Sequence, residues 1–190
     1  MYYLTQNKTI QERLVKEHSP ALEKSKADFI ELLTSEEVDD FEFTKRCMYE
    51  SLRACPPASA NFPSRFYKTT KIGGVQFTPD DTFVVNIESV CHDPTIWRAP
   101  EVFNPDRFDP ASEWYLRPDN KPRSPLAFCA FSGGKRVCLG KTFADIMLGY
   151  TIPLIYFHFD FTFTNEDQAT NKPYYQSGSF KVPEMKVNVH

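Results

Sequence analysis

The chain has 190 residues, 25% of them charged, and a formal net charge of -3. This is long enough for one domain with a hydrophobic core, and the charge balance does not favour nucleic-acid binding. The five cysteines are odd in number and include no C-x-x-C pair, which argues against a disulfide framework and a structural zinc site. No run approaches the roughly 18 apolar residues of a membrane-spanning helix, and no signal-peptide pattern is present.

Helical patterns come first along the chain. Asn7 is placed to cap a helix that runs to Lys16, and Pro20 is expected to interrupt the helical stretch. A second helix is predicted over roughly 21–33. The run 34–37, Thr-Ser-Glu-Glu, then has the form of a capping box that opens a further short helix.

The next predicted helix covers 43–55 and stops at two prolines. It contains the pattern E-x-x-R at Glu50 and Arg53, whose charges lie one helical turn apart. Taken alone, such a pair is most simply a solvated ion pair worth about 0.2–0.5 kcal/mol. It gains meaning only from motifs farther along the chain.

The middle of the chain favours strands and loops. Residues 65–72 and 75–77 flank Gly73-Gly74 and predict a hairpin, and 82–87 predicts a third strand. From 92 to 128 the chain is rich in Pro, Asp and Trp without a sustained period, which indicates a long ordered meander.

The last part begins with a helix predicted over about 139–151. From Phe157 onward the residues alternate as strands do, with a turn near Ser177-Gly178. The predicted fold class is therefore mainly α with small β-sheets, an α+β arrangement.

The most informative segment precedes that last helix. Phe131, Gly134, Arg136, Cys138 and Gly140 form the pattern F-x-x-G-x-R-x-C-x-G. A lone cysteine would be taken as a small buried hydrophobe, but five fixed residue types at fixed spacing rarely meet by chance. The pattern resembles the haem-ligand loop of the cytochrome P-450 family.

That resemblance gives each loop residue a role. Cys138 is expected to bind the iron of haem (iron protoporphyrin IX) as a thiolate, the only metal ligand expected from this chain. Arg136 is expected near a haem propionate, because a forked guanidinium suits a carboxylate. Phe131 would cover the sulfur side, and Gly134 would allow a tight turn close to the macrocycle.

Further segments are similar to other family elements. The run Pro105-Asp-Arg107-Phe resembles P-E-R-F, which implies a buried network of Glu50, Arg53 and Arg107 that fixes the meander. Its role would be structural, and no catalytic residue in bond-making is expected.

Two more residues are candidates for haem contact. His92, in His-Asp-Pro, is placed where a family histidine bonds a propionate, although a surface or capping histidine fits equally well. Arg65 is placed like a propionate-binding arginine of many family members.

The order of these elements implies one partial domain over 1–190, the C-terminal part of an incomplete cytochrome P-450 fold of the microsomal kind. The distal helix and the N-terminal part are expected to be absent, and only that absent part would make membrane contact. For the full-length protein the resemblance suggests the endoplasmic reticulum membrane.

The implied activity is a haem-thiolate monooxygenase that inserts one oxygen atom of dioxygen into a small organic or lipophilic substrate. A flavin-containing reductase would supply electrons from NADPH. The alternatives are a truncated haem-binding module or a non-functional remnant without turnover. A cysteine hydrolase is a weaker idea, because no histidine is evidently oriented toward Cys138.

The sequence also departs from the family. Ala130 replaces a common proline before Phe131, and Asp81 stands where a glycine usually ends a turn. Gly149 and Pro153 are expected to weaken the helix after Cys138.

Overall fold

A computed structural model describes residues 2–22, 31, 41–159, 161–163, 174–176, 179–181 and 187–189. The α-helices in these ranges are α1 (Tyr2–Thr5), α2 (Lys8–Leu22), α4 (Glu42–Ala54), α5 (Ile87–Cys91) and α6 (Lys141–His158). Short 3-10 helices are η2 (Pro105–Phe108), η3 (Glu113–Tyr115) and η4 (Gly134–Arg136). The strands are β1 (Ser64–Arg65), β2 (Thr70–Ile72), β3 (Val75–Phe77), β4 (Thr82–Phe83), β5 (Phe161–Phe163), β6 (Tyr174–Gln176), β7 (Ser179–Lys181) and β8 (Val187–Val189).

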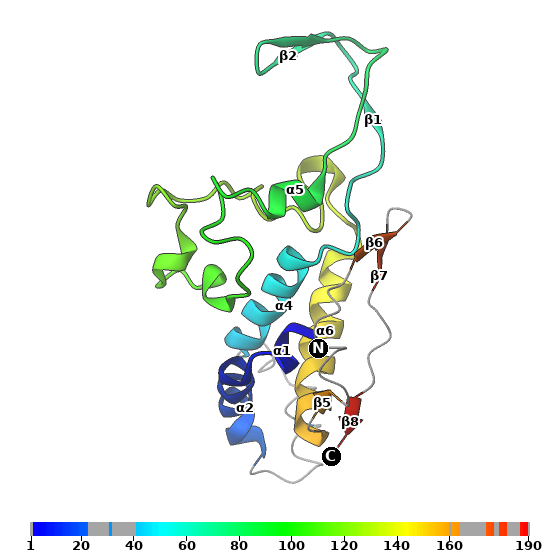
Figure 1. Ribbon diagram of the computed structural model, residues 1–190. Helices are drawn as coiled ribbons and strands as arrows, with labels where there is room; N and C mark the ends of the chain where they lie inside the picture. Colours follow the sequence, from blue (N-terminus) through cyan, green and yellow to red (C-terminus); the bar gives the residue numbers. More distant parts are fainter. Residues whose placement is uncertain are drawn as a thin grey trace.

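Three helices, α2, α4 and α6, pack against one another and form the body of the structure (Figure 1). Their shared core is apolar and consists of Leu4, Ile10, Leu14, Phe43 and Cys47, with Phe103, Ile152 and Tyr156 packed against it. Within the described residues, no helix is both long and apolar enough to cross a bilayer.

The cap predicted at Asn7 is confirmed, because the Ile10 amide donates to Asn7 Oδ1 at 3.2 Å. The predicted interruption at Pro20 is wrong, since α2 continues to Leu22. A proline in the last turn removes one backbone bond, while burial of Leu14 and His18 on the same helix holds it in place. The helix predicted over 21–33 lies mostly, and the capping box wholly, outside the described residues.

Helix α4 agrees with the predicted helix to within a residue at each end. Its N-terminus is capped from a distance, because the Glu17 carboxylate accepts from the amides of Phe43 at 2.6 Å and Thr44 at 2.9 Å. A carboxylate there accepts from amides that have no partner within the helix, and its negative charge interacts favourably with the positive end of the helix dipole. This contact ties α2 to the start of α4.

The strands of the middle region differ in part from the prediction. Strands β2 and β3 form the expected hairpin around Gly73 and Gly74, which have φ values of 57° and 86°. Strand β1 pairs instead with β4, in register Ser64↔Phe83. Figure 1 shows the hairpin projecting away from the helical body.

The third strand predicted over 82–87 is too long. Strand β4 ends at Phe83, and Ile87 opens α5. The reason is Asn86, whose side chain accepts from the Ser89 amide at 2.9 Å. An N-cap of this kind favours a helix over continued β structure.

The meander over 92–128 is confirmed, and its only helical segments are the short 3-10 helices η2 and η3. Helix α6 begins two residues later than predicted and continues seven residues farther, through Gly149 and Pro153. The Pro153 side chain is fully buried, so packing outweighs the lost hydrogen bond. In the tail, β5 pairs with β8 and β6 with β7; the predicted turn at Ser177-Gly178 lies outside the described residues.

Candidate functional site

The loop before α6 is closed by a backbone hydrogen bond from the Cys138 amide to the Phe131 carbonyl at 2.8 Å. Inside it, Ser132 and Gly134 have φ values of 60° and 63°. These left-handed conformations turn the chain sharply and suit a glycine at 134. The closed turn leaves the Cys138 thiol exposed to solvent.

A second glycine lets the loop approach its neighbour. A Cβ added at Gly133 would lie 2.7 Å from Leu126 Cδ2, so any side chain would push Leu126 aside. Gly140 lies beside the thiol, because a Cβ there would be 3.8 Å from Cys138 Sγ. The two glycines keep the backbone close to Leu126 and to the sulfur.

Aromatic rings of α4, η2 and the preceding segment pack against the loop. The Phe128 ring lies 5.4 Å from Tyr49 of α4 and 5.3 Å from Phe108 of η2. Phe131 packs at 6.5 Å on Phe128, and Lys141 Nζ lies 5.6 Å from the Phe131 ring centroid. Edge-to-face and tilted contacts at these distances are favourable for aromatic pairs.

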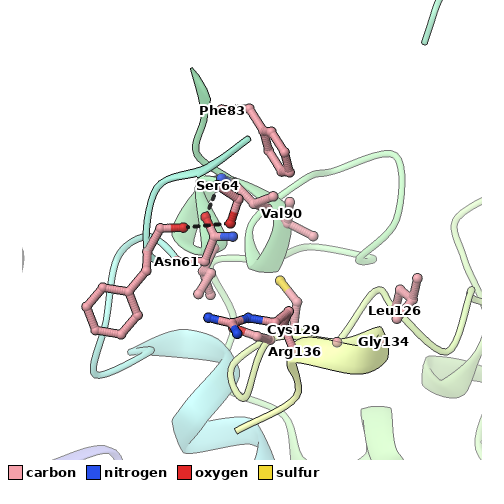
Figure 2. Close-up of a pocket in the computed structure, with 13 residues that line it drawn as sticks. Asn61, Ser64, Phe83, Val90, Leu126, Cys129, Gly134 and Arg136 are labelled. Carbon is pink, nitrogen blue, oxygen red and sulfur yellow. Dashed lines mark hydrogen bonds between the residues drawn. The ribbon is translucent and has the colours of Figure 1, made fainter. Parts of the chain in front are cut away.

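A cavity of about 440 Å³ lies beside the loop (Figure 2). Its walls are mostly apolar and carry one cationic side chain; they consist of Asn61, Phe62, Ser64, Phe83, Val85, Ile87, Val90, Leu126, Cys129, Ser132, Gly133, Gly134 and Arg136. The cavity thus joins the β1–β4 region, α5 and the loop.

The cavity brings together some of the predicted site residues. Gly134 and Arg136 line it, whereas Phe131 and Cys138 belong to the same loop without being part of the wall. Arg65 is exposed on β1, directly after Ser64, which does line the cavity.

His92 follows α5 and is not part of the cavity wall. Its Nδ1 lies 3.0 Å from the Glu88 carbonyl oxygen, so Nδ1 is the donor. A neutral ring has only one N–H, so a propionate could accept from Nε2 only if the ring were protonated. His92 is the C-cap residue of α5, which agrees with the capping role that the sequence analysis gave as an alternative. Its contact with haem stays a prediction.

The predicted network of Glu50, Arg53 and Arg107 is confirmed. All three side chains are fully buried. Arg53 Nε donates to Glu50 Oε2 at 2.8 Å and Arg107 Nε to Glu50 Oε1 at 3.2 Å. One carboxylate between two guanidiniums offsets part of the cost of burying three charges.

The two guanidiniums also hold the meander through its carbonyl groups. Arg53 donates to Cys91 and Pro100, each at 2.9 Å. Arg107 donates to Ala99 at 2.6 Å and to Val102 at 3.0 Å. Burial lowers the pKa of Arg107, which the Glu50 carboxylate opposes.

One arginine of this region was missed by the sequence analysis. Arg123 donates to the carbonyls of Trp114 and Arg107, and its guanidinium lies 4.4 Å from the centre of the Trp97 ring. Burial is the main cause that lowers the pKa of Arg123 to about 10. Its only sequence signal is a position near the end of the meander, which does not distinguish it from a surface arginine.

The residues present fit a haem. Its apolar macrocycle suits the apolar walls, and its carboxylates suit Arg136. In the described parts of the chain, no group of three or more His, Cys, Asp or Glu could hold a metal ion. With Cys138 as one ligand of the iron, the porphyrin of a haem would supply further ligands.

Comparisons with known proteins agree with this geometry. The family model described as Cytochrome P450 matches residues 1–189. Human cytochrome P450 4F12 is 34% identical over 85% of this chain and 29% of its own length. A human ultra-long-chain fatty acid omega-hydroxylase is 30% identical over 80% of this chain and 29% of its own length. The chain thus spans under a third of the length of these curated relatives.

Solved structures show the same fold. A retinoic acid-bound cyanobacterial CYP120A1 superposes with a TM-score of 0.80 at 25% identity, over 99% of this chain and 40% of that chain. A zebrafish cytochrome P450 structure with abiraterone gives a TM-score of 0.75 at 22% identity, over 100% and 42% of the two chains. The predicted fold class, part of the cytochrome P-450 fold with helices and small sheets, is confirmed. The chain belongs to the cytochrome P450 family.

Proposed function

We propose that this chain is the haem-binding part of a haem-thiolate monooxygenase, with Cys138 as the ligand of the iron. The observation that carries the proposal is the exposed Cys138 thiol at the end of a closed, glycine-turned loop beside an apolar cavity. A thiolate needs a metal, a cation or amide donors to be stable at neutral pH. The remaining cysteines of the chain are buried or half-buried.

The chain's own residues would bind and orient the cofactor. Cys138 would hold the iron, and Arg136 would bind a propionate from the cavity wall. Phe131, packed on Phe128, would limit access of water to the sulfur side. Arg65 and His92 are proposed as further propionate contacts. Gly134 would let the loop follow the macrocycle.

When bound, haem would supply the activation of dioxygen and the oxidation of substrate, with electrons from NADPH through a flavin-containing reductase. We propose a substrate of the lipophilic class. The relative named as an ultra-long-chain fatty acid omega-hydroxylase supports the same class. For the whole protein we propose a place at the endoplasmic reticulum membrane.

A second candidate is haem binding without turnover by these 190 residues alone. It is favoured by the exposed apolar side chains that follow the loop: Leu139 is 101% exposed, Phe143 69% and Ile146 52%. Apolar groups gathered in this way favour association with further protein surface. Full turnover would then require more of the family's fold than this chain supplies.

The test is a carbon monoxide difference spectrum of the purified chain, reconstituted with haem and reduced. A strongly red-shifted Soret band is expected for the wild type and absent in Cys138→Ser. Cys55→Ser is the matched control, since serine can keep the hydrogen bond with Tyr3. A folded wild-type chain without the band, or with the same band in Cys138→Ser, would overturn the assignment. Product formation with a reductase then separates the two candidates.

A further inference from the structure

Two other thiols lie next to each other at the cavity. Cys91 ends α5, and Cys129 stands just before the loop that carries Cys138. They share one apolar cluster with Ile87, at 0% and 8% exposure. Their side chains pack together with Ile87 in this buried cluster. Segments far apart in the sequence therefore bring two thiols into contact.

The two thiols differ in access. Cys129 is part of the cavity wall, whereas Cys91 is not. Figure 2 shows the Cys129 sulfur pointing toward the Val90 side of the cavity. A small solute that enters the cavity would therefore meet Cys129 first.

They also differ in acidity. The neighbouring Cys91 thiol lowers the pKa of Cys129. The neighbouring Cys129 thiol, together with burial, raises the pKa of Cys91. The thiolate, the form that reacts with oxidants, is thus favoured at Cys129 with Cys91 as its protonated neighbour.

We propose that Cys91 and Cys129 are a peroxide-responsive thiol pair, in which a hydroperoxide oxidises Cys129 from the cavity and Cys91 closes a disulfide. Access and contact both support this order of events. The pair is separate from Cys138, and a hydroperoxide would reach Cys129 while the cavity holds no haem, so the test uses the haem-free chain.

The chemistry balances in two steps. The Cys129 thiolate attacks the hydroperoxide, so that an S–O bond forms, the O–O bond breaks and the departing oxygen takes a proton to leave as alcohol or water. The Cys91 sulfur then attacks the Cys129 sulfenic acid, and an S–S bond forms. The sulfenic oxygen leaves as water with the proton of the Cys91 thiol. Two electrons pass from the sulfurs to the peroxide.

The disulfide would join two structural units. The Cys91 carbonyl accepts from Arg53 at 2.9 Å, and the Cys129 carbonyl accepts from the Ser132 amide at 2.8 Å. A covalent link would fasten the end of α5 and the buried charge network to the base of the loop. Thiol reductants would reverse it.

The test treats the reduced 190-residue chain, without haem, with hydrogen peroxide and maps disulfides by peptide mass spectrometry. The expected product is a linked Cys91–Cys129 peptide, with loss of two of the five free thiols and recovery of both on reduction. Cys55→Ser should give the same link. Links that join Cys138 to either thiol, in place of this one, would overturn the proposal.

Two variants test the order of the steps. In Cys91→Ser, a sulfenic acid should accumulate at Cys129, where dimedone traps it. In Cys129→Ser, Cys91 should stay reduced; its oxidation there would contradict the assigned roles. The wild type gives an answer without any variant, because native alkylation should label Cys129 before Cys91, and the reverse order would refute the proposal.

Discussion

Arg107 of η2 donates from Nε to Glu50 Oε1 of α4 at 3.2 Å, across 57 positions of the sequence. Both side chains are fully buried, and the Asn104 amide donates to the same oxygen at 2.8 Å. The carboxylate thus connects the helix to the meander, and its charge compensates two guanidiniums. Arg53, which also binds Glu50, donates to the Cys91 carbonyl at the end of α5. Since α5 contributes to the cavity wall, the same carboxylate helps to hold that wall in place.

Glu50→Gln should lower the free energy of unfolding by about 3–5 kcal/mol, because it leaves two buried guanidiniums without their carboxylate. Urea unfolding followed by circular dichroism measures the change. Glu42→Gln, at an exposed position on the same helix, should cost no more than about 1 kcal/mol through the helix dipole. Equal costs for the two variants would mean that the network does not contribute as inferred.

Local patterns were sufficient for several parts of the structure. Asn7 predicted the start of α2, and the spacing of Glu50 and Arg53 together with Arg107 predicted the buried network. In each case the information lies within a few residues, or in a family motif that links distant segments. Such features depend little on the rest of the fold.

The cavity could not be predicted in this way. Its wall combines Asn61, Phe83 and Leu126, which come from separate segments and have no shared pattern. The neighbouring thiols Cys91 and Cys129 were also missed, since only packing brings them together. The strand predicted over 82–87 failed for a local reason, because the cap at Asn86 outweighed the β-branched run.

His18 gives the fold a specific pH dependence. Its Nε2 lies 2.8 Å from Thr44 Oγ1, whose own proton goes to Glu17, so Nε2 is the donor of a neutral ring. Burial lowers the pKa of His18 to about 4 from 6.5. The unfolded chain therefore binds the proton more readily. The contribution of His18 to the free energy of unfolding is therefore fully present above pH 6.5. It is lost as the pH drops toward 4, which lowers the free energy of unfolding by up to about 3 kcal/mol.

His18→Gln should flatten this part of the stability profile, because glutamine can donate to Thr44 without titrating. Unfolding free energies of both proteins are measured between pH 7 and pH 4. The difference between the two curves isolates His18 from the carboxylates that titrate in both. Parallel curves over that range would refute the assignment of a neutral buried histidine.

The two adjacent glycines of the loop should respond differently to alanine. Gly134 has φ of 63° and open space around it, so Gly134→Ala costs backbone strain of about 1–2 kcal/mol. Gly134→Asn should recover part of that loss, since asparagine tolerates this region. Thermal unfolding with and without haem measures both effects.

At Gly133 the obstacle is a neighbouring side chain and the backbone is extended. Leu126 is 62% exposed and can rotate away, so Gly133→Ala should cost less than about 1 kcal/mol. Leu126→Ala should remove the cost of Gly133→Ala and leave that of Gly134→Ala unchanged. Rescue of both variants by Leu126→Ala would contradict the separate causes.

Arg136 and Lys135 are neighbouring exposed cations with different positions relative to the cavity. Only Arg136 belongs to the cavity wall, so only Arg136→Gln should remove a charge-assisted contact with a propionate. Loss of such a bond, about 1.5–3 kcal/mol, corresponds to roughly 10- to 100-fold weaker haem binding. Haem titration by absorbance measures the affinity of each variant. Lys135→Gln should bind haem with an affinity within about threefold of the wild type, since it removes only a solvated surface charge. An equal loss of haem affinity in both variants would indicate a general effect of net charge.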